Sequence, residues 1–269
     1  MSLSSTYIIS LFHHFRVNQR QKNRLIFPKK RRKWRKYLPQ YRSNLRSTRK
    51  LFTQNTFWNQ HITVIRKTLF LAFFQAFLED QVDQSSCTKS DDDIVLILAT
   101  YNAKRNGFLL GGKSLIVTPT NIRLIFGITG GNTKLTLKNA FKPNKPFVRR
   151  RFQNVERLTI TIVREQLLEA LKGQSLDDIE DVARLLCLYV IGTLFLVRTG
   201  AYMGWLHVHN IEDLNKIYTY QWPEHICETL LASVQKNHSK LDNVMGCVMA
   251  LLVSTQNSFI LLYSKIHFL

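Results

Sequence analysis

The stretch that decides the fold runs from residue 175 to residue 197 and reads SLDDIEDVARLLCLYVIGTLFLV. Its first four residues, Ser175-Leu176-Asp177-Asp178, resemble a capping box with Asp in place of the usual Glu. Behind this cap the chain is apolar nearly all round, which is typical of a helix buried in the interior of a protein. The sequence therefore predicts a central core helix over residues 177–197.

Other helices are predicted on both sides of this core helix from apolar residues at helical spacing. Their expected ranges are 68–79, 94–101, 119–126, 155–171, 222–234 and 244–253. Asn210 is expected to cap one further helix, because Asp213 follows three residues later. The stretch from Gly130 through Pro143 and Pro146 is expected to form a loop.

The region before the core helix carries clear start and stop signals. Residues 94–101 are ambiguous by periodicity, but the acidic run 91–93 suits a helix N-terminus, so we expect a helix. A small hairpin is predicted at 108–110 and 114–117, around Gly111-Gly112. Thr118-Pro119 then supplies an N-cap and a first helical residue, and Gly127 can end that helix.

These elements predict a mainly α protein. We expect an irregular helical domain with one small β-hairpin, preceded by a basic, largely disordered arm. The expected divisions are a basic arm at 1–67, a hydrophobic helix and polar linker at 68–90, the helical domain at 91–253 and an apolar tail at 254–269. No apolar run approaches the roughly 20 residues of a membrane span, so no membrane contact is predicted.

The positive charge is concentrated at the N-terminus. The formal net charge is +20, and 17 of the 38 Lys and Arg precede Glu79, the first acidic residue. The other 21 face all 18 Asp and Glu, so the rest of the chain is nearly neutral. A neutral domain with a basic extension indicates an anionic partner, such as nucleic acid, an acidic receptor or a membrane surface. Of these three we expect nucleic acid or an acidic receptor.

The densest part of the arm is the predicted contact site. It consists of Lys29, Lys30, Arg31, Arg32, Lys33, Trp34, Arg35 and Lys36. Such a cluster fits the acidic groove of a nuclear import receptor, or nucleic-acid phosphates with Trp34 stacked on a base. The alternative is a solvated tail without a partner. Sequence-specific DNA recognition is disfavoured, because no helix-turn-helix or zinc-finger pattern is present.

Carboxylate and histidine pairs are the first candidates for catalysis or metal binding. Asp91–Asp93 and Asp177-Asp178 could suggest a nuclease-like metal site, but their positions at helix starts favour capping. His207 and His209 lack a Cys or carboxylate at ligand spacing, apart from helix-start acids, so surface loop histidines are expected. The sequence therefore predicts no metal site and no cofactor.

Cysteines are the second candidates. None of the four is spaced as C-x-x-C, and most lie in apolar stretches. Cys187 falls in the core helix, where burial raises a thiol pKa, and Cys227 follows His225 at a spacing that does not bring the two together on a helix. Both are expected to be packing residues in a reducing compartment. We predict no catalytic residue and a protein that is not an enzyme.

Two stretches resemble a known group of plant domains. One is residues 111–131; the other is residues 183–195, followed by residues 212–222. They resemble the plant mobile domain group, also called aminotransferase-like, and the related transposon-associated plant domains of unknown function found beside SUMO-protease-like regions. The resemblance covers about residues 91–252. Asn121-Ile122 replaces the usual acidic-Val pair, and Thr129 replaces the usual Pro.

The resemblance implies a helical nuclear protein of transposon-derived type with no established catalysis. No lysine here indicates a pyridoxal-phosphate site, so the aminotransferase-like label implies no chemistry. We therefore expect a non-enzymatic nuclear interaction module, tethered to nucleic acid or chromatin by its arm and bound through its helical domain to an unknown protein. The alternatives are a transposase-associated or degenerate enzyme fragment, and a general basic nucleic-acid-binding protein.

Overall fold

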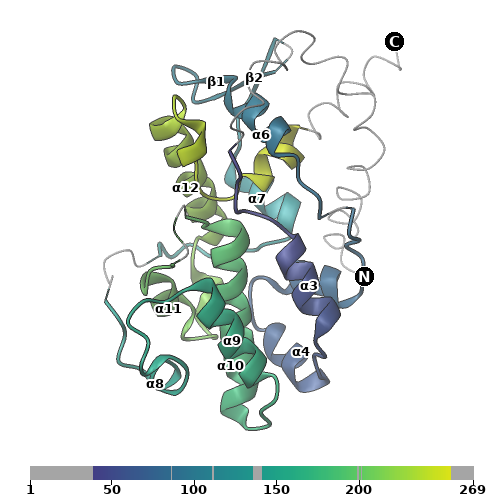
Figure 1. Ribbon diagram of the computed structural model, residues 1–269, viewed down its shortest axis with the longest axis vertical. Coiled ribbons are helices and arrows are strands. Elements are labelled where there is room, and N and C mark those ends of the chain that lie inside the picture. Colours follow the sequence, from purple (N-terminus) through teal and green to yellow (C-terminus); the bar gives the residue numbers. More distant parts are fainter. Residues whose placement is uncertain are drawn as a thin grey trace.

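The computed structural model describes residues 39–85, 87–110, 112–135, 141–198, 200 and 202–255. They form a mainly helical protein with one small sheet, as predicted (Figure 1). The α-helices are α3 (Arg46–Gln54), α4 (Asn59–Ile65), α5 (Leu71–Leu78), α6 (Asp91–Leu98), α7 (Pro119–Phe126), α8 (Pro146–Phe152), α9 (Ile160–Ala170), α10 (Leu176–Val190), α11 (Leu206–Ile211) and α12 (Trp222–Asn237). Short helical turns are η1 (Ile191–Phe195), η2 (Ile217–Thr219) and η3 (Leu241–Asn243).

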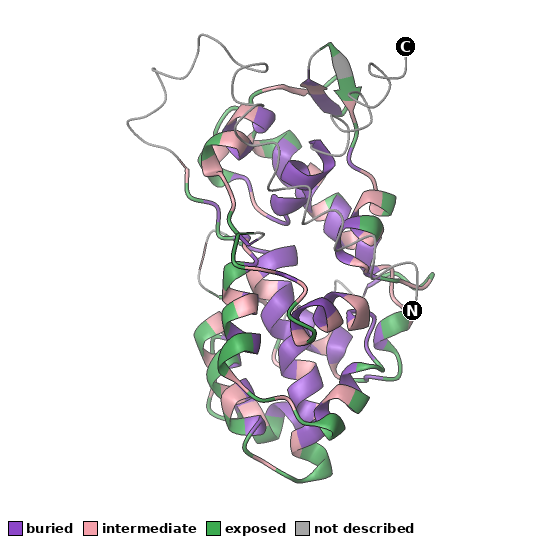
Figure 2. Ribbon diagram, turned by 90° about the vertical axis from the view of Figure 1, so that its right-hand side faces the viewer, coloured by how far each residue is buried: buried purple, intermediate pink, exposed green. Residues whose placement is uncertain are grey.

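The predicted core helix is confirmed as α10, which the π-helix η1 continues to Phe195. Ser175 caps it as expected: its Oγ accepts from the Asp178 N–H at 3.1 Å, and the Asp178 carboxylate accepts from the Ser175 N–H at 3.4 Å. Buried residues run along the whole of α10, and α4 and α9 pack against it (Figures 1 and 2). The apolar sequence thus places this helix in the centre of the fold.

Aromatic side chains join α5 to the centre of the protein. The rings of Phe70 and Phe73 both lie 5.5 Å from the ring of Phe195. Phe126 of α7 meets Phe195 edge-on at 5.2 Å, and Trp222 of α12 lies 6.0 Å from Phe70. Such offset and edge-on pairs are the favoured geometries of buried aromatic rings. The core therefore unites segments from residue 70 to residue 222.

The expectation that the basic arm extends to residue 67 is wrong, because residues 39–67 pack into this core. Leu51 of α3 is 2% exposed and Ile65 of α4 is fully buried. Arg46 and Lys50 of α3 are exposed to solvent, so this helix is amphipathic. Its positive charges lie on the outer face and leave the apolar face free to pack.

The predicted hairpin is confirmed as β2 (Gly107–Leu110) and β3 (Lys113–Leu115), with Phe108 opposite Leu115. A third strand that was not predicted, β1 (Tyr101–Asn102), pairs with the other edge of β2. The three strands form one antiparallel sheet in the order β1-β2-β3. The helix predicted over residues 94–101 is confirmed as α6, except that it ends at Leu98 and Tyr101 belongs to β1.

The signals around α7 are confirmed at both ends. The Thr118 hydroxyl accepts from the Asn121 N–H at 3.4 Å, and the Asn121 side chain accepts from the Thr118 N–H at 2.8 Å. Pro119 is the first helical residue. Gly127 ends the helix with φ of 61°, a left-handed conformation that glycine adopts without the cost of a side chain.

Between the sheet and the core helix, the prediction was wrong in two places. Residues 146–152, expected as part of a loop, form α8, which begins at Pro146 and buries Phe147 and Phe152. The following helix, expected from residue 155, begins later as α9, with Thr159 as its N-cap. In both cases the local apolar pattern did not define the first turn.

Two predictions near the C-terminus also need correction. Asn210 lies inside α11, and its Nδ2 donates to the Leu206 carbonyl at 3.0 Å instead of capping a helix. The last helix, expected from Val244, begins at residue 249 in the described chain. Trp222-Pro223 does begin α12, as predicted. Residues 256–269 of the expected tail lie outside the described residues.

Candidate functional site

The predicted contact residues Lys29–Lys36 lie outside the residues that the structure describes. The described part of the arm begins at residue 39 and runs across the end of η1. Ser43 donates its hydroxyl proton to the Leu194 carbonyl at 2.9 Å, and Tyr41 donates to the Leu241 carbonyl at 3.0 Å. The arm is therefore anchored to the helical fold immediately after its basic part.

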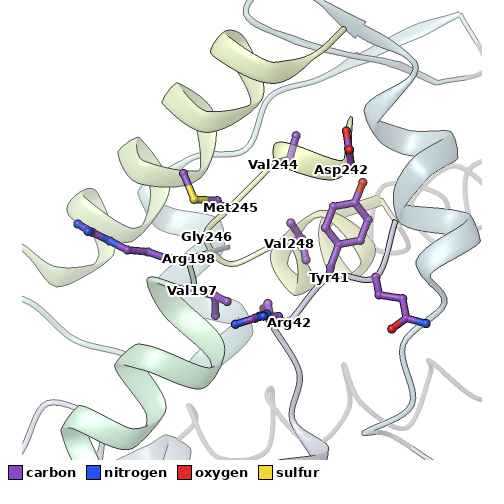
Figure 3. Close-up of a pocket in the computed structure, with 11 residues that line it drawn as sticks. Tyr41, Arg42, Val197, Arg198, Asp242, Val244, Met245, Gly246 and Val248 are labelled. Carbon is purple, nitrogen blue, oxygen red and sulfur yellow. The ribbon is translucent and has the colours of Figure 1, made fainter. Parts of the chain in front are cut away.

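A small cleft lies beside this anchor, and we call it the Arg42 cleft. Its volume is about 230 Å³, and it lies between residues 40–43, residues 197–198 and residues 242–248 (Figure 3). Arg42 and Arg198 are exposed on its walls, and neither side chain has a carboxylate partner among the residues that the structure describes. Asp242 contributes a carboxylate to the lining of the cleft. The lining thus includes two arginines without a carboxylate partner in the described chain, of which Arg42 belongs to the arm and Arg198 extends away from it (Figure 3).

A larger cleft, the α11–α12 cleft, lies on the other side of Arg198. Its volume is about 670 Å³. One face of α12 lines it with His225, Thr229, Ala232 and Lys236, which recur at helical spacing. Leu206 and His207 of α11 line it as well, together with residues 196–198. No Asp or Glu lines it within the described chain.

His207 is the least expected residue of this cleft. It is 5% exposed and lies on α11, so the prediction of a surface loop histidine is wrong for it. Its Nδ1 has no hydrogen-bond partner in the described structure. Burial, with smaller effects from Arg198 and His225, lowers the pKa of His207 to about 4. The imidazole is therefore neutral at pH 7.

The histidines near His207 have surroundings of their own. Burial also lowers the pKa of His225, against the opposing effect of Glu228. His209 lies 3.2 Å from the Phe141 carbonyl through its Nε2 and is also helical. Among the described residues, no group of three or more His, Cys, Asp or Glu side chains is arranged to hold a metal ion.

Helices α8 and α10 are joined by a partly buried ion-pair network that the sequence did not predict. We call it the arginine–aspartate cluster. The Asp181 carboxylate of α10 is fully buried and accepts from Arg150 at 2.9 and 3.0 Å, from Arg151 at 2.8 Å and from Arg184 at 3.0 Å. Arg184 also donates to Glu180 and lies 5.7 Å from the Phe147 ring. This network fixes α8 against α10.

Of the candidate carboxylates, Asp178 has the capping role predicted for it, whereas at the start of α6 the cap is Ser90. Ser90 accepts from the Asp93 N–H at 3.2 Å at the start of α6, in the same way that Ser175 accepts at the start of α10. Asp178 also pairs with Arg151, and the Ser175 hydroxyl together with Arg151 lowers the pKa of Asp178. Asp177 pairs with Arg150 at 3.2 Å. Asp177 and Asp178 are therefore occupied by a cap and by arginines, and Asp91 pairs with Lys89 at 2.7 Å.

The cysteines are buried, as predicted. Burial raises the pKa of Cys187 far above its usual range, and burial with Glu228 and Glu224 raises that of Cys227 to about 11. The Cys227 thiol donates to the Val117 carbonyl at 3.5 Å. A buried thiol with a raised pKa is a poor nucleophile. These cysteines therefore pack the core.

Comparisons with known proteins gave one family. The model of a domain of unknown function, DUF8566, matches residues 83–252, which is more than half of the chain. No curated protein and no solved structure matches the chain. The matched range includes both walls of the α11–α12 cleft and all of the arginine–aspartate cluster. Within the described residues, no helix is long and apolar enough to cross a membrane.

Proposed function

The chain belongs to the DUF8566 family, and on that premise we propose that it is a non-enzymatic interaction module that contacts nucleic acid through its basic arm. The charge distribution carries this proposal. The 78 residues before Glu79 hold 17 Lys and Arg and no acidic residue. Because nucleic acid is a dense array of phosphates, an uncompensated basic segment binds it through release of counterions.

The arrangement around Arg42 supports a continuous contact surface. The arm joins the fold at residues 39–43, and the exposed residues Arg42 and Arg198 both line the Arg42 cleft (Figure 3). A phosphate backbone that follows the arm would meet these two guanidinium groups where the arm ends. Arginine is well suited to this contact, because its planar fork binds phosphate through two hydrogen bonds.

The non-enzymatic part of the proposal is supported by the state of the candidate groups. A metal-dependent nuclease needs free carboxylates, but Asp177, Asp178 and Asp181 are bound by arginines. A cysteine nucleophile needs a lowered thiol pKa, but burial raises that of Cys187 and Cys227. Of the other candidate carboxylates, Asp91 pairs with Lys89 at 2.7 Å, and no group of three or more metal-binding side chains lies among the described residues.

The nuclear location and the likeness to plant mobile domains stay part of the proposal. The same cluster at residues 29–36 that would bind phosphates also has the composition of an import signal. The helical domain would then bring an unidentified protein partner to nucleic acid. A general basic nucleic-acid-binding protein remains the alternative, and it differs in requiring no such partner.

The test replaces the seven basic residues at 29–36 by Gln in the full chain, leaving Trp34 in place. We expect binding to a fluorescent DNA duplex, followed by anisotropy at several salt concentrations, to weaken strongly. The slope of log K against log salt should become shallower by about 0.9 for each phosphate that the variant no longer neutralises. Arg42→Gln should make the slope shallower by the equivalent of one further phosphate.

A matched control neutralises two exposed basic residues away from the arm. Lys104 and Arg105 lie in the turn between β1 and β2, and their replacement by Gln should leave the slope unchanged. If the cluster variant binds with the same salt dependence as the natural chain, the arm is not the contact and the proposal fails. Fluorescent fusions of the same variants would report nuclear entry separately.

A further inference from the structure

We propose that the α11–α12 cleft binds a small organic anion with an apolar body. This cleft adjoins the nucleic-acid contact proposed for the arm and shares Arg198 with it. Its volume of about 670 Å³ falls within the range of roughly 300–1,000 Å³ that is typical of small-molecule sites. The cleft lies within the range that matches the family, between α11, α12 and residues 196–198.

The charge of the lining selects an anion. Arg198 and Lys236 both line the cleft, and neither has a carboxylate partner among the described residues. The lining itself contains no Asp or Glu, and Glu228 is the acidic group that acts on His225 from the same helix. A concave surface whose charged groups are all positive concentrates negatively charged ligands.

His207 gives evidence for a ligand that does not depend on the charge of the lining. It is only 5% exposed in the wall of the cleft, yet its Nδ1 has no hydrogen-bond partner in the described structure. Buried polar atoms are nearly always hydrogen-bonded, because leaving one unpaired is costly. After a turn of the ring, a polar atom of a bound ligand would satisfy this nitrogen.

The remaining lining requires an apolar body on the ligand. Leu196, Val197, Leu206, Ala232 and Met245 contribute apolar surface around the two cations. An inorganic phosphate would leave this surface exposed to water, and so would a nucleic-acid backbone. A carboxylate or phosphate group attached to a hydrocarbon or aromatic body would contact both kinds of surface at once.

The first experiment is calorimetric titration of the full chain with 4-phenylbutyrate and with its uncharged amide, 4-phenylbutyramide. The two probes share one shape and differ in charge. We expect the carboxylate to bind with a Kd on the order of 1 mM, as suits a ligand of this size. The amide should bind about tenfold more weakly.

Variants then locate the binding. Ala232→Trp fills the cleft from an exposed position of α12 and should abolish binding, while Gln235→Trp on the outer face should not. Lys236→Met keeps the length of the side chain but removes its charge, and it should weaken the binding of 4-phenylbutyrate roughly five- to tenfold. Lys240→Met, outside the lining, is its control.

Three outcomes would overturn the proposal. The cleft takes no such ligand if neither probe binds up to its solubility limit. The charge does not select the ligand if carboxylate and amide bind equally. The site lies elsewhere if the Ala232→Trp variant binds 4-phenylbutyrate as tightly as the Gln235→Trp variant does. Because none of these variants touches residues 29–36, DNA binding by the same proteins tests the function proposed for the arm independently.

Discussion

In the arginine–aspartate cluster, the buried Asp181 carboxylate is paired with arginines. The α11–α12 cleft instead holds two cations and a buried imidazole, and no carboxylate lines it in the described chain. Asp181 is fully buried and accepts hydrogen bonds from three arginines. In the cleft, Arg198 and Lys236 have no carboxylate partner and the Nδ1 of His207 has no hydrogen-bond partner among the residues that the structure describes. Both regions lie within the same matched family range.

The contrast separates charges that hold the fold from charges that are available for binding. A buried polar network in which every member is satisfied fixes the elements that contribute to it. Cations without a carboxylate partner and a buried imidazole without a hydrogen-bond partner, as the described residues have here, add nothing of that kind. A ligand in the cleft explains them more readily. Each region therefore predicts a different response to the same kind of substitution.

The largest effect is expected when the cluster loses its central charge. Asp181→Asn keeps the size of the side chain but leaves three guanidinium groups facing a neutral amide. Removal of one partner from a buried ion-pair network costs about 3 kcal/mol or more. We expect the free energy of unfolding, measured by urea denaturation, to fall by that amount.

Asp177→Asn is the matched control for this substitution. The Asp177 side chain is 63% exposed and pairs with Arg150 alone, so solvent screens the pair and its removal should cost less than about 1 kcal/mol. Equal destabilisation by Asp177→Asn and Asp181→Asn would mean that the cluster is not the structural unit described above.

The second effect is a dependence of stability on pH that comes from the cleft. The pKa of His207 is lowered to about 4 in the folded chain, mainly by burial and also by Arg198 and His225, against about 6.5 when unfolded. Between these values the unfolded chain binds the proton and the folded chain does not, so stability falls as the pH falls from about 6.5 to about 4. The full decrease is about 3 kcal/mol.

His207→Gln isolates this contribution, because Gln is polar, similar in size and does not titrate. Urea denaturation of both proteins between pH 7 and pH 4 should show that the natural chain is destabilised more by acidification than the variant. His225 also has a lowered pKa, but it is present in both proteins and cancels. Parallel curves would show that His207 titrates normally and is not buried as described.

The parts of the fold that the sequence predicted are those set by neighbouring residues. The cap of α10 needs Ser175 and Asp178, three residues apart, and both ends of α7 are marked by Thr118-Pro119 and by Gly127. These hydrogen bonds and backbone angles are local, so the residue types alone indicate them. The burial of the long apolar stretch at 177–197 is predictable for the same reason.

The parts that were missed depend on residues far along the chain. In α8, three consecutive arginines indicate a loop or a surface, and they are tolerated in this helix because Arg150 and Arg151 meet Asp181 some 30 residues away. Residues 39–67 resemble an arm because their charge conceals the apolar face of α3. Nothing local to His207 indicated that it would line a cleft, since α12 forms the facing wall.

The smallest effect is expected for the free cations of the cleft, and it completes the contrast with the cluster. Lys236→Met and Arg198→Met remove charges that have no carboxylate partner in the described chain, so the free energy of unfolding should change by less than about 0.5 kcal/mol. Arg184→Met in the cluster removes a guanidinium that is bound to Asp181 and Glu180 and should cost several times more. If Lys236→Met destabilised the chain as much as Arg184→Met, the cleft cations would hold the fold, and their availability for a ligand would have no support.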